Sequence, residues 1–139
     1  MVAVILAAAR PGKLASMIVY GISNCDTVKR ARAWLDQRGA AYTFHDFKKA
    51  GVPSNQLDAW LKSAGWEALL NRKGTTWRQL DVATQARVAD ASSARALMLD
   101  QPSVIKRPVV QWDDGRITVG FDAAQWTESA AGIEFLPAL

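Results

Sequence analysis

Cys25, the one cysteine of this 139-residue chain, is the strongest candidate for chemistry. It follows a short apolar run and precedes a segment with helical periodicity, so the thiol is expected where a strand passes into a helix. Free backbone N–H groups and the helix dipole at such a junction favour the thiolate, which is the reactive form of cysteine. We therefore expect a redox nucleophile rather than a small buried apolar residue, a common role of free cysteine.

Charged side chains close to Cys25 in the sequence would act on this thiolate in opposite directions. Lys29 and Arg30 lie one helical turn further on and would favour the thiolate if they face the sulfur, whereas Asp26 would oppose it. His45, the one histidine, could act as a general base. A strand-end histidine with a local hydrogen bond is the more common situation, and we favour it here.

A second group of polar side chains occupies a segment far from Cys25 in the sequence. Its members are Arg72, Lys73, Thr75 and Arg78. They either line a site for the carboxylates of a substrate or form a solvated loop, and the sequence favours neither.

The composition excludes several classes of protein. Half of the residues are apolar, 22% are charged and the net charge is +4, values typical of a globular domain. Basic residues occur in pairs rather than in a dense stripe, so no nucleic-acid partner is expected. No apolar run reaches the length of a membrane span, and no membrane partner is expected. One cysteine allows no internal disulfide and no cysteine-rich metal site, and it suits a reducing, cytoplasmic compartment.

The elements that must position Cys25 come first in the chain. An apolar run at residues 17–22 predicts a strand, residues 26–38 have helical periodicity, and residues 42–47 predict a second strand. A strand, helix and strand of this length make a βαβ unit with parallel strands. Further on, residues 109–112 and 117–120 flank an Asp-Gly turn and predict a β-hairpin.

Helical segments separate these two halves and also end the domain. The middle of the chain predicts helices over residues 54–64, capped by Ser54, and over residues 82–89 and 93–100. A last helix fits residues 123–129. The order is therefore β-α-β, a helical insert, then β-β-α, which is a thioredoxin-like α/β fold with a mixed four-stranded sheet.

The predicted domain organisation has three parts. Residues 1–16 are expected to be an N-terminal extension and residues 131–139 a C-terminal tail. Residues 17–130 form the thioredoxin-like domain, with the helical insert at about residues 53–101.

Four motifs in this order resemble the arsenate-reductase-related ArsC/Spx family, and most closely its YffB-like branch. They are Asn-Cys-Asp-Thr at 24–27, Trp-Glu-Ala-Leu-Leu-Asn at 66–71, Gly-Thr-Thr-Trp-Arg at 74–78 and Ile-Lys-Arg-Pro at 105–108. The resemblance runs from about residue 17 to residue 127. It implies a thioredoxin-like fold with a helical insert and a thiol-dependent reductase that uses glutathione as co-substrate, with no bound cofactor.

The resemblance also assigns roles to Arg107 and Pro108. It implies a cis proline that faces the cysteine loop and an arginine that contacts a bound oxyanion. The fork of an arginine matches carboxylate or oxyanion geometry, which agrees with that role. We predict Cys25 and Arg107 as the catalytic residues. The predicted substrate-binding residues are Asn24, Lys29, Arg72, Thr75 and Pro108.

The sequence departs from the family pattern at several positions. Arsenate reductases of this family use two further arginines, where this chain has Asn71 and either Gly120 or Phe121. Gly21 stands near the place of a family histidine. Val28 occupies the second cysteine position of the CxxC switch that Spx regulators often carry, so a second thiol must come from another molecule.

The leading hypothesis is a cytoplasmic thiol oxidoreductase in which Cys25 attacks a disulfide or oxyanion substrate and glutathione resolves the intermediate. One alternative is an arsenate reductase linked to glutathione or glutaredoxin. The other is an Spx-like regulator that contacts RNA polymerase without catalysis.

Overall fold

The computed structural model describes residues 17–129, so the predicted N-terminal extension and C-terminal tail lie outside the described residues. Its centre is a four-stranded mixed sheet in the order β2-β1-β3-β4. β1 pairs with β2 in parallel, and the β1–β3 and β3–β4 pairs are antiparallel. This confirms the predicted α/β fold class. The strands are β1 (Ile18–Gly21), β2 (Thr43–Asp46), β3 (Val109–Gln111) and β4 (Ile117–Val119).

Helix α3 (Asp26–Gln37) connects the two parallel strands, as the periodicity predicts. Its buried side chains are spaced at three and four residues, which turns one stripe of the helix toward the sheet. The helix ends before Gly39, which adopts a φ of 68° that glycine tolerates without strain. The buried residues of α3 are Val28, Ala31, Trp34 and Leu35.

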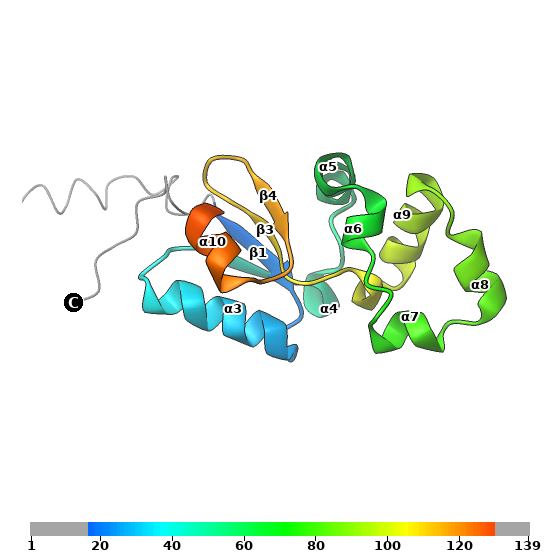
Figure 1. Ribbon diagram of the computed structural model, residues 1–139, viewed down its shortest axis with the longest axis horizontal. Coiled ribbons are helices and arrows are strands. Elements are labelled where there is room, and N and C mark those ends of the chain that lie inside the picture. The colour runs from blue at the N-terminus through cyan, green and yellow to red at the C-terminus, as the bar shows by residue number, and fades with distance from the viewer. Residues whose placement is uncertain (1–16, 130–139) are drawn as a thin grey trace, which may run out of the picture.

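One face of the sheet is covered by α3 and by the last helix, α10 (Ala123–Ser129) (Figure 1). The ring of Trp126 from α10 packs edge-on against Trp34 of α3 and Trp112 beside β3, with ring centroids 5.6 and 5.2 Å apart. Val19 and Val110 of the sheet join this cluster. Successive side chains of a strand point to opposite faces, so their neighbours Tyr20 and Val109 belong to a second cluster.

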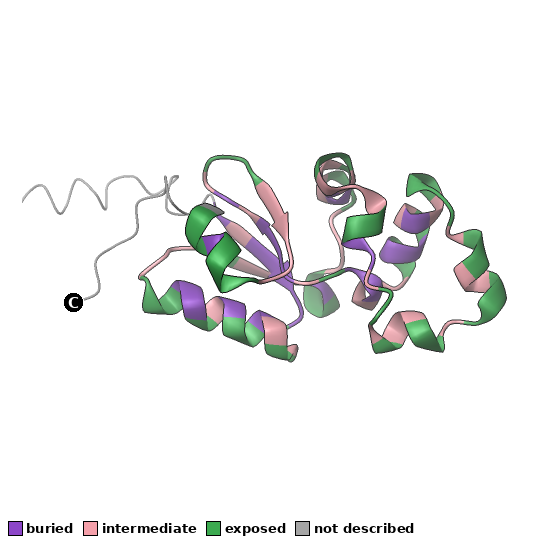
Figure 2. Ribbon diagram, in the orientation of Figure 1, coloured by how far each residue is buried: buried purple, intermediate pink, exposed green. Residues whose placement is uncertain are grey.

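The second cluster joins the sheet to the helical segment between β2 and β3. Figure 2 shows the buried residues of that segment gathered on its inner side. Leu57 and Trp60 are fully buried there, and the Trp60 ring lies 4.7 Å from that of Tyr20. The helices of the segment are α4 (Phe47–Ala50), α5 (Ser54–Ala64), α6 (Trp66–Leu69), α7 (Thr75–Gln79), α8 (Val82–Arg87), α9 (Ala91–Asp100) and the 3-10 helix η1 (Pro102–Val104).

Several helix ends differ from the sequence predictions. Ser54 is not a cap: it is the first residue of α5, and Pro53 precedes the helix without a capping side chain. Phe47 is helical rather than the end of a strand, because the Asp46 side chain caps α4. Asp90 starts α9 two residues earlier than predicted, through a reciprocal pair of hydrogen bonds with Ser93.

Candidate active site

Cys25 lies at the end of a tight turn between β1 and α3. The turn is closed by a hydrogen bond from the Cys25 backbone N–H to the Ile22 carbonyl oxygen, at 3.2 Å. Cys25 is the residue immediately before α3, with extended backbone angles, and its carbonyl accepts the Lys29 N–H at 2.9 Å. The thiol is partly exposed. This is the strand-to-helix position that the sequence predicts.

The surroundings of Cys25 stabilise its thiolate. Burial by itself raises the pKa of the thiol, but hydrogen bonds from the Val28 backbone N–H and the Arg107 side chain lower it. The charge of Arg107 and the Thr27 N–H act in the same direction, and the net pKa is below the ordinary value. Two of these groups are helix-start N–H groups that have no partner within the helix. The thiol therefore ionises more easily than a free cysteine.

Arg107 is held in place by the backbone of its own loop. Its Nη1 donates to the Ser103 carbonyl oxygen at 2.8 Å and to the Ile105 carbonyl oxygen at 3.2 Å. The Arg107–Pro108 peptide bond is cis, as the resemblance implies. Pro108 is buried, and its carbonyl accepts the Gly120 N–H at 2.8 Å. The guanidinium therefore reaches Cys25 from a fixed direction.

The loop that carries Arg107 is tied to the insert by a short antiparallel bridge. Leu70 faces Ile105, the Asn71 N–H donates to the Val104 carbonyl and the Lys106 N–H donates to the Leu69 carbonyl, both at 2.8 Å. The insert thus supports the loop that carries one of the groups that stabilise the thiolate.

Gly21 allows the close approach of β1 to the first turn of α3. A Cβ atom added at Gly21 would lie 2.8 Å from Cγ2 of Val28, a fully buried side chain. A β-branched side chain in a helix has essentially one rotamer, so it cannot turn away. A side chain such as the family histidine would therefore not fit at Gly21, because Val28 packs tightly beneath the cysteine turn.

Sequence reasoning missed Asp46 as a component of this site. Its carboxylate accepts the Lys48 N–H at 2.8 Å and is also hydrogen-bonded by Ser23, which belongs to the cysteine turn. The available signal was an aspartate at a strand end followed by a short polar segment, which is typical of a helix cap.

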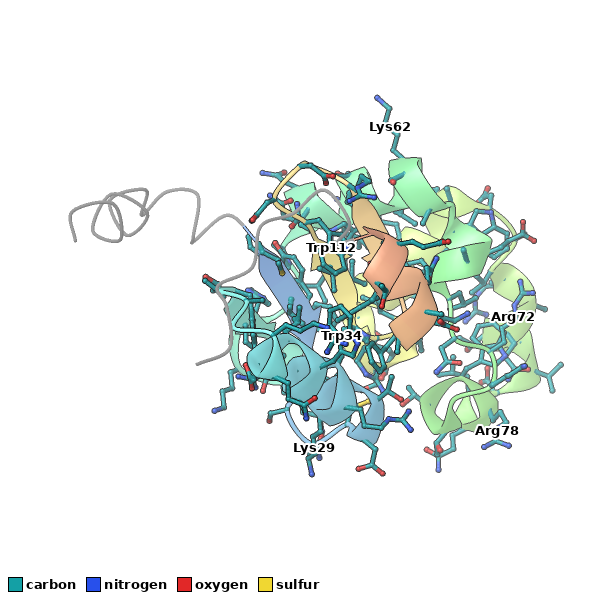
Figure 3. The ribbon with its side chains drawn as sticks, turned by 60° about the vertical axis from the view of Figure 1, so that its left-hand side comes forward. Lys29, Trp34, Lys62, Arg72, Arg78 and Trp112 are labelled. Atoms are coloured by element: carbon teal, nitrogen blue, oxygen red, sulfur yellow. The ribbon has the colours of Figure 1, made fainter. Side chains whose placement is uncertain are left out.

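The other polar and charged residues near Cys25 in the sequence face solvent. Asn24, Asp26 and Lys29 are exposed, and Figure 3 shows Lys29 extending outward from α3. The groups that lower the pKa of Cys25 are those of Val28, Arg107 and Thr27, and Lys29 is not among them. The condition under which Lys29 would favour the thiolate is therefore not met, and binding of substrate by Asn24 and Lys29 stays a prediction.

His45 makes a local hydrogen bond, as favoured from the sequence. Its Nε2 lies 2.7 Å from the Gly51 carbonyl oxygen, which can only accept, so Nε2 carries the proton. The ring packs on Tyr20, with centroids 5.1 Å apart.

The segment at residues 72–78 lies on the insert (Figure 3). Arg72, Thr75 and Arg78 are exposed, and Thr75 is the first residue of α7. The guanidinium of Arg72 stands over the Trp66 ring at 5.5 Å. No hydrogen bond or ion pair found within residues 17–129 joins these side chains to Cys25 or Arg107.

The positions that lack the family arginines have structural roles of their own. The Asn71 Oδ1 accepts the Lys73 N–H at 3.2 Å and so shapes its own loop. Gly120 has a φ of 87°, which disfavours any side chain. Phe121 packs against Trp126, with ring centroids 4.7 Å apart. These three positions therefore do not supply cationic groups to the site.

The described residues contain neither a membrane-spanning helix nor a metal-binding cluster. Between residues 17 and 129 no helix is both long enough and apolar enough to cross a membrane. The same residues contain no group of three or more His, Cys, Asp or Glu side chains placed to hold a metal ion.

Comparison with known proteins gives consistent matches. The ArsC family model matches residues 20–129. A solved YffB structure is 45% identical with a TM-score of 0.73, covering 84% of this chain and 96% of that one. The solution structure of an arsenate reductase (ArsC) related protein from Brucella melitensis is 52% identical with a TM-score of 0.65, covering 81% and 92%. An uncharacterized protein of Haemophilus influenzae is 35% identical over 81% of this chain and 97% of its own length.

More distant relatives include a transcriptional regulator. The global transcriptional regulator Spx of Staphylococcus epidermidis is 22% identical over 71% of this chain and 75% of its own length.

Proposed function

The chain belongs to the ArsC family and has its arsenate-reductase-like fold, and from this premise we propose that it is a glutathione-dependent thiol oxidoreductase with Cys25 as nucleophile. The observation that carries the proposal is the surroundings of the thiol. Two helix-start N–H groups and the Arg107 guanidinium lower its pKa, while the sulfur stays partly exposed. A stabilised and accessible thiolate is what attack on a disulfide requires.

The proposed reaction has three exchange steps. The Cys25 thiolate attacks one sulfur of a substrate disulfide, forming a mixed disulfide and releasing the other sulfur as a thiolate that takes a proton from water. A glutathione thiolate attacks the Cys25 sulfur, which forms a Cys25–glutathione disulfide and releases the second substrate thiol. A second glutathione thiolate then attacks the glutathione sulfur of that disulfide, which releases the Cys25 thiolate and oxidised glutathione. Two glutathione molecules are oxidised and one substrate disulfide is reduced.

Glutathione is proposed as the reductant because this chain contains one cysteine and cannot form an internal disulfide. Arg107 is proposed to bind one carboxylate of glutathione beside the sulfur. Arg72 and Thr75 are proposed to lie toward its other end, and Pro108 to shape the backbone next to Cys25. A glutathione pool also agrees with a cytoplasmic location, which we propose on the same ground.

Arsenate reduction is the comparison activity for this proposal. A compact oxyanion needs several converging cationic donors. The positions of the two further family arginines hold Asn71 and Gly120 or Phe121, so these positions add no cationic donor to that of Arg107. We therefore expect weak or absent arsenate turnover beside measurable glutathione-dependent disulfide reduction, with both activities measured on one preparation.

The direct test is mass spectrometry of the intact protein after incubation with oxidised glutathione. One glutathione should be found on Cys25, and reduced glutathione should remove it. Cys25→Ser serves as the blank. Absence of the adduct, or efficient arsenate turnover without disulfide reduction, would contradict the proposal. Binding to RNA polymerase stays an untested alternative, which a pull-down with purified polymerase would address.

A further inference from the structure

We propose that Asp46 is a positioning residue, whose buried carboxylate holds Ser23 and so keeps Cys25 aligned with the first turn of α3 and with Arg107. The inference rests on the proposed function only in that it concerns the same thiol.

The sheet places Asp46 next to the turn that it is proposed to hold. It ends β2 directly opposite Gly21, the last residue of β1, and Ser23 of the cysteine turn follows two residues later. Asp46 is 8% exposed, and within residues 17–129 it is the one charged or polar residue that is buried. A buried carboxylate is costly unless hydrogen bonds compensate for its lost hydration, so its partners must be held tightly.

Three donors compensate the carboxylate, and two of them belong to the cysteine turn. The Lys48 N–H donates at 2.8 Å. The hydroxyl and the backbone N–H of Ser23 are the others. Burial raises the pKa of Asp46, but these hydrogen bonds and the charge of Lys49 lower it below the ordinary value, so the group is ionised. One anion therefore ties the start of α4 to the turn that presents Cys25.

The sign of the effect on Cys25 separates positioning from simple charge. A negative charge near a thiol disfavours the thiolate, so removing the charge alone would lower the pKa of Cys25. Loosening the turn would instead weaken the hydrogen bonds from Val28 and Arg107 that favour the thiolate. Positioning therefore requires the thiol pKa to rise when the Asp46 carboxylate is lost.

The experiment measures the rate of Cys25 alkylation by iodoacetamide as a function of pH. Asp46→Asn should move the midpoint upward by about 0.5–1 pH unit, the equivalent of weakening one hydrogen bond to the thiolate. Asp90→Asn is the matched control, because Asp90 also accepts from a serine N–H and hydroxyl, at 2.9 and 2.8 Å, but at the start of α9. It should lower the unfolding temperature and leave the midpoint unchanged.

Ser23→Ala is the second variant, because it removes one donor to Asp46 and keeps the buried charge. It should shift the midpoint in the same direction by a smaller amount. If Asp46→Asn does not fold, Ser23→Ala alone tests whether the Asp46–Ser23 contact positions Cys25. An unchanged or lowered midpoint in either folded variant would overturn the proposal. The assay contains no glutathione, so failure of glutathione-dependent reduction would contradict the proposed function without affecting this result.

Discussion

The Cys25–Arg107 centre and the segment at residues 72–78 both carry groups suited to an anionic thiol substrate, but they are built differently. At the centre, Cys25 is fixed by a closed turn, and Arg107 donates to two backbone carbonyls of its own loop. In the segment, Arg72, Thr75 and Arg78 are exposed, and Arg72 is steadied by the Trp66 ring.

This difference indicates where chemistry and where recognition should reside. Groups held by backbone contacts need no reordering when charge develops, so they act on the reacting atoms. Exposed cations on long side chains lose rotamer freedom on binding and are screened by salt. We therefore expect large effects on rate from substitutions at the centre and small effects on affinity from substitutions in the segment.

Cys25→Ser gives the largest expected effect. The serine hydroxyl cannot form a disulfide, so thiol-disulfide exchange should fall to the uncatalysed rate. The assay follows glutathione-dependent reduction of a small disulfide, and circular dichroism confirms that the variant is folded. Activity of the variant well above the rate without protein would show that Cys25 is not the nucleophile.

Arg107→Ala should have the next largest effect. Loss of one charge-assisted pair costs about 1.5–3 kcal/mol, or about 10-fold to 150-fold in kcat/KM. The midpoint of Cys25 alkylation should also rise, because the charge and hydrogen bond of Arg107 lower the pKa of the thiol.

Arg95→Ala is the matched control for that variant. Arg95 pairs with Asp58 at 2.6 Å between α9 and α5, so its loss should affect stability and leave the kinetics unchanged. Equal kinetic constants for Arg107→Ala and the wild type would show that the centre does not include the guanidinium.

Two glycine substitutions compare the rigidity of the two regions. An added Cβ would lie 2.8 Å from Val28 Cγ2 at Gly21 and 2.8 Å from Asn71 Nδ2 at Gly74. Val28 is buried and stiff, whereas the Asn71 amide ends a side chain that is not fully buried. Gly21→Ala should therefore lower the free energy of unfolding by about 1–3 kcal/mol, and Gly74→Ala by less than about 1 kcal/mol. Chemical denaturation measures both, and equal losses would contradict the assigned difference in rigidity.

The fold and the centre could be predicted to different extents. The βαβ unit, the hairpin and α10 follow from local periodicity and turn chemistry, and the structure confirms them. The position of Cys25 follows from the same pattern. The helix ends were harder to predict. Asp46 and Asp90 determine the starts of α4 and α9 through side-chain hydrogen bonds that periodicity does not register, and α5 starts after Pro53 with no capping side chain at all.

Contacts between segments that are distant in the chain could not be predicted from the sequence pattern. That Ser23 meets Asp46 depends on the register of β1 against β2, and register is a property of the folded sheet. Whether Lys29 faces the sulfur was left open for the related reason that nearness in sequence does not decide which way a side chain points. Arg107 was assigned through the family resemblance, since its distance from Cys25 in the chain gives no local signal.

The pH dependence of stability offers a smaller but informative effect. The folded pKa of Cys25 lies below its usual value. Its ionisation therefore stabilises the fold above the unfolded pKa of about 8.5, and this contribution is lost as the pH falls through the folded pKa. The difference in unfolding free energy between the wild type and Cys25→Ser should thus increase with pH between about 6 and 9. A difference independent of pH would show that the thiolate is not stabilised.

Arg72→Ala should have the smallest effect and tests the other side of the comparison. An exposed cation contributes about 0.5–1 kcal/mol, so KM for a glutathione-containing substrate should rise about 2-fold to 5-fold while kcat stays unchanged. High salt should remove most of the difference because the contact is open to solvent. Lys62→Ala removes an exposed charge from α5, and Figure 3 shows Lys62 extending away from Arg72, so its kinetics should match the wild type. A fall in kcat, or a rise in KM beyond tenfold that resists salt, would place Arg72 with the rigid centre instead.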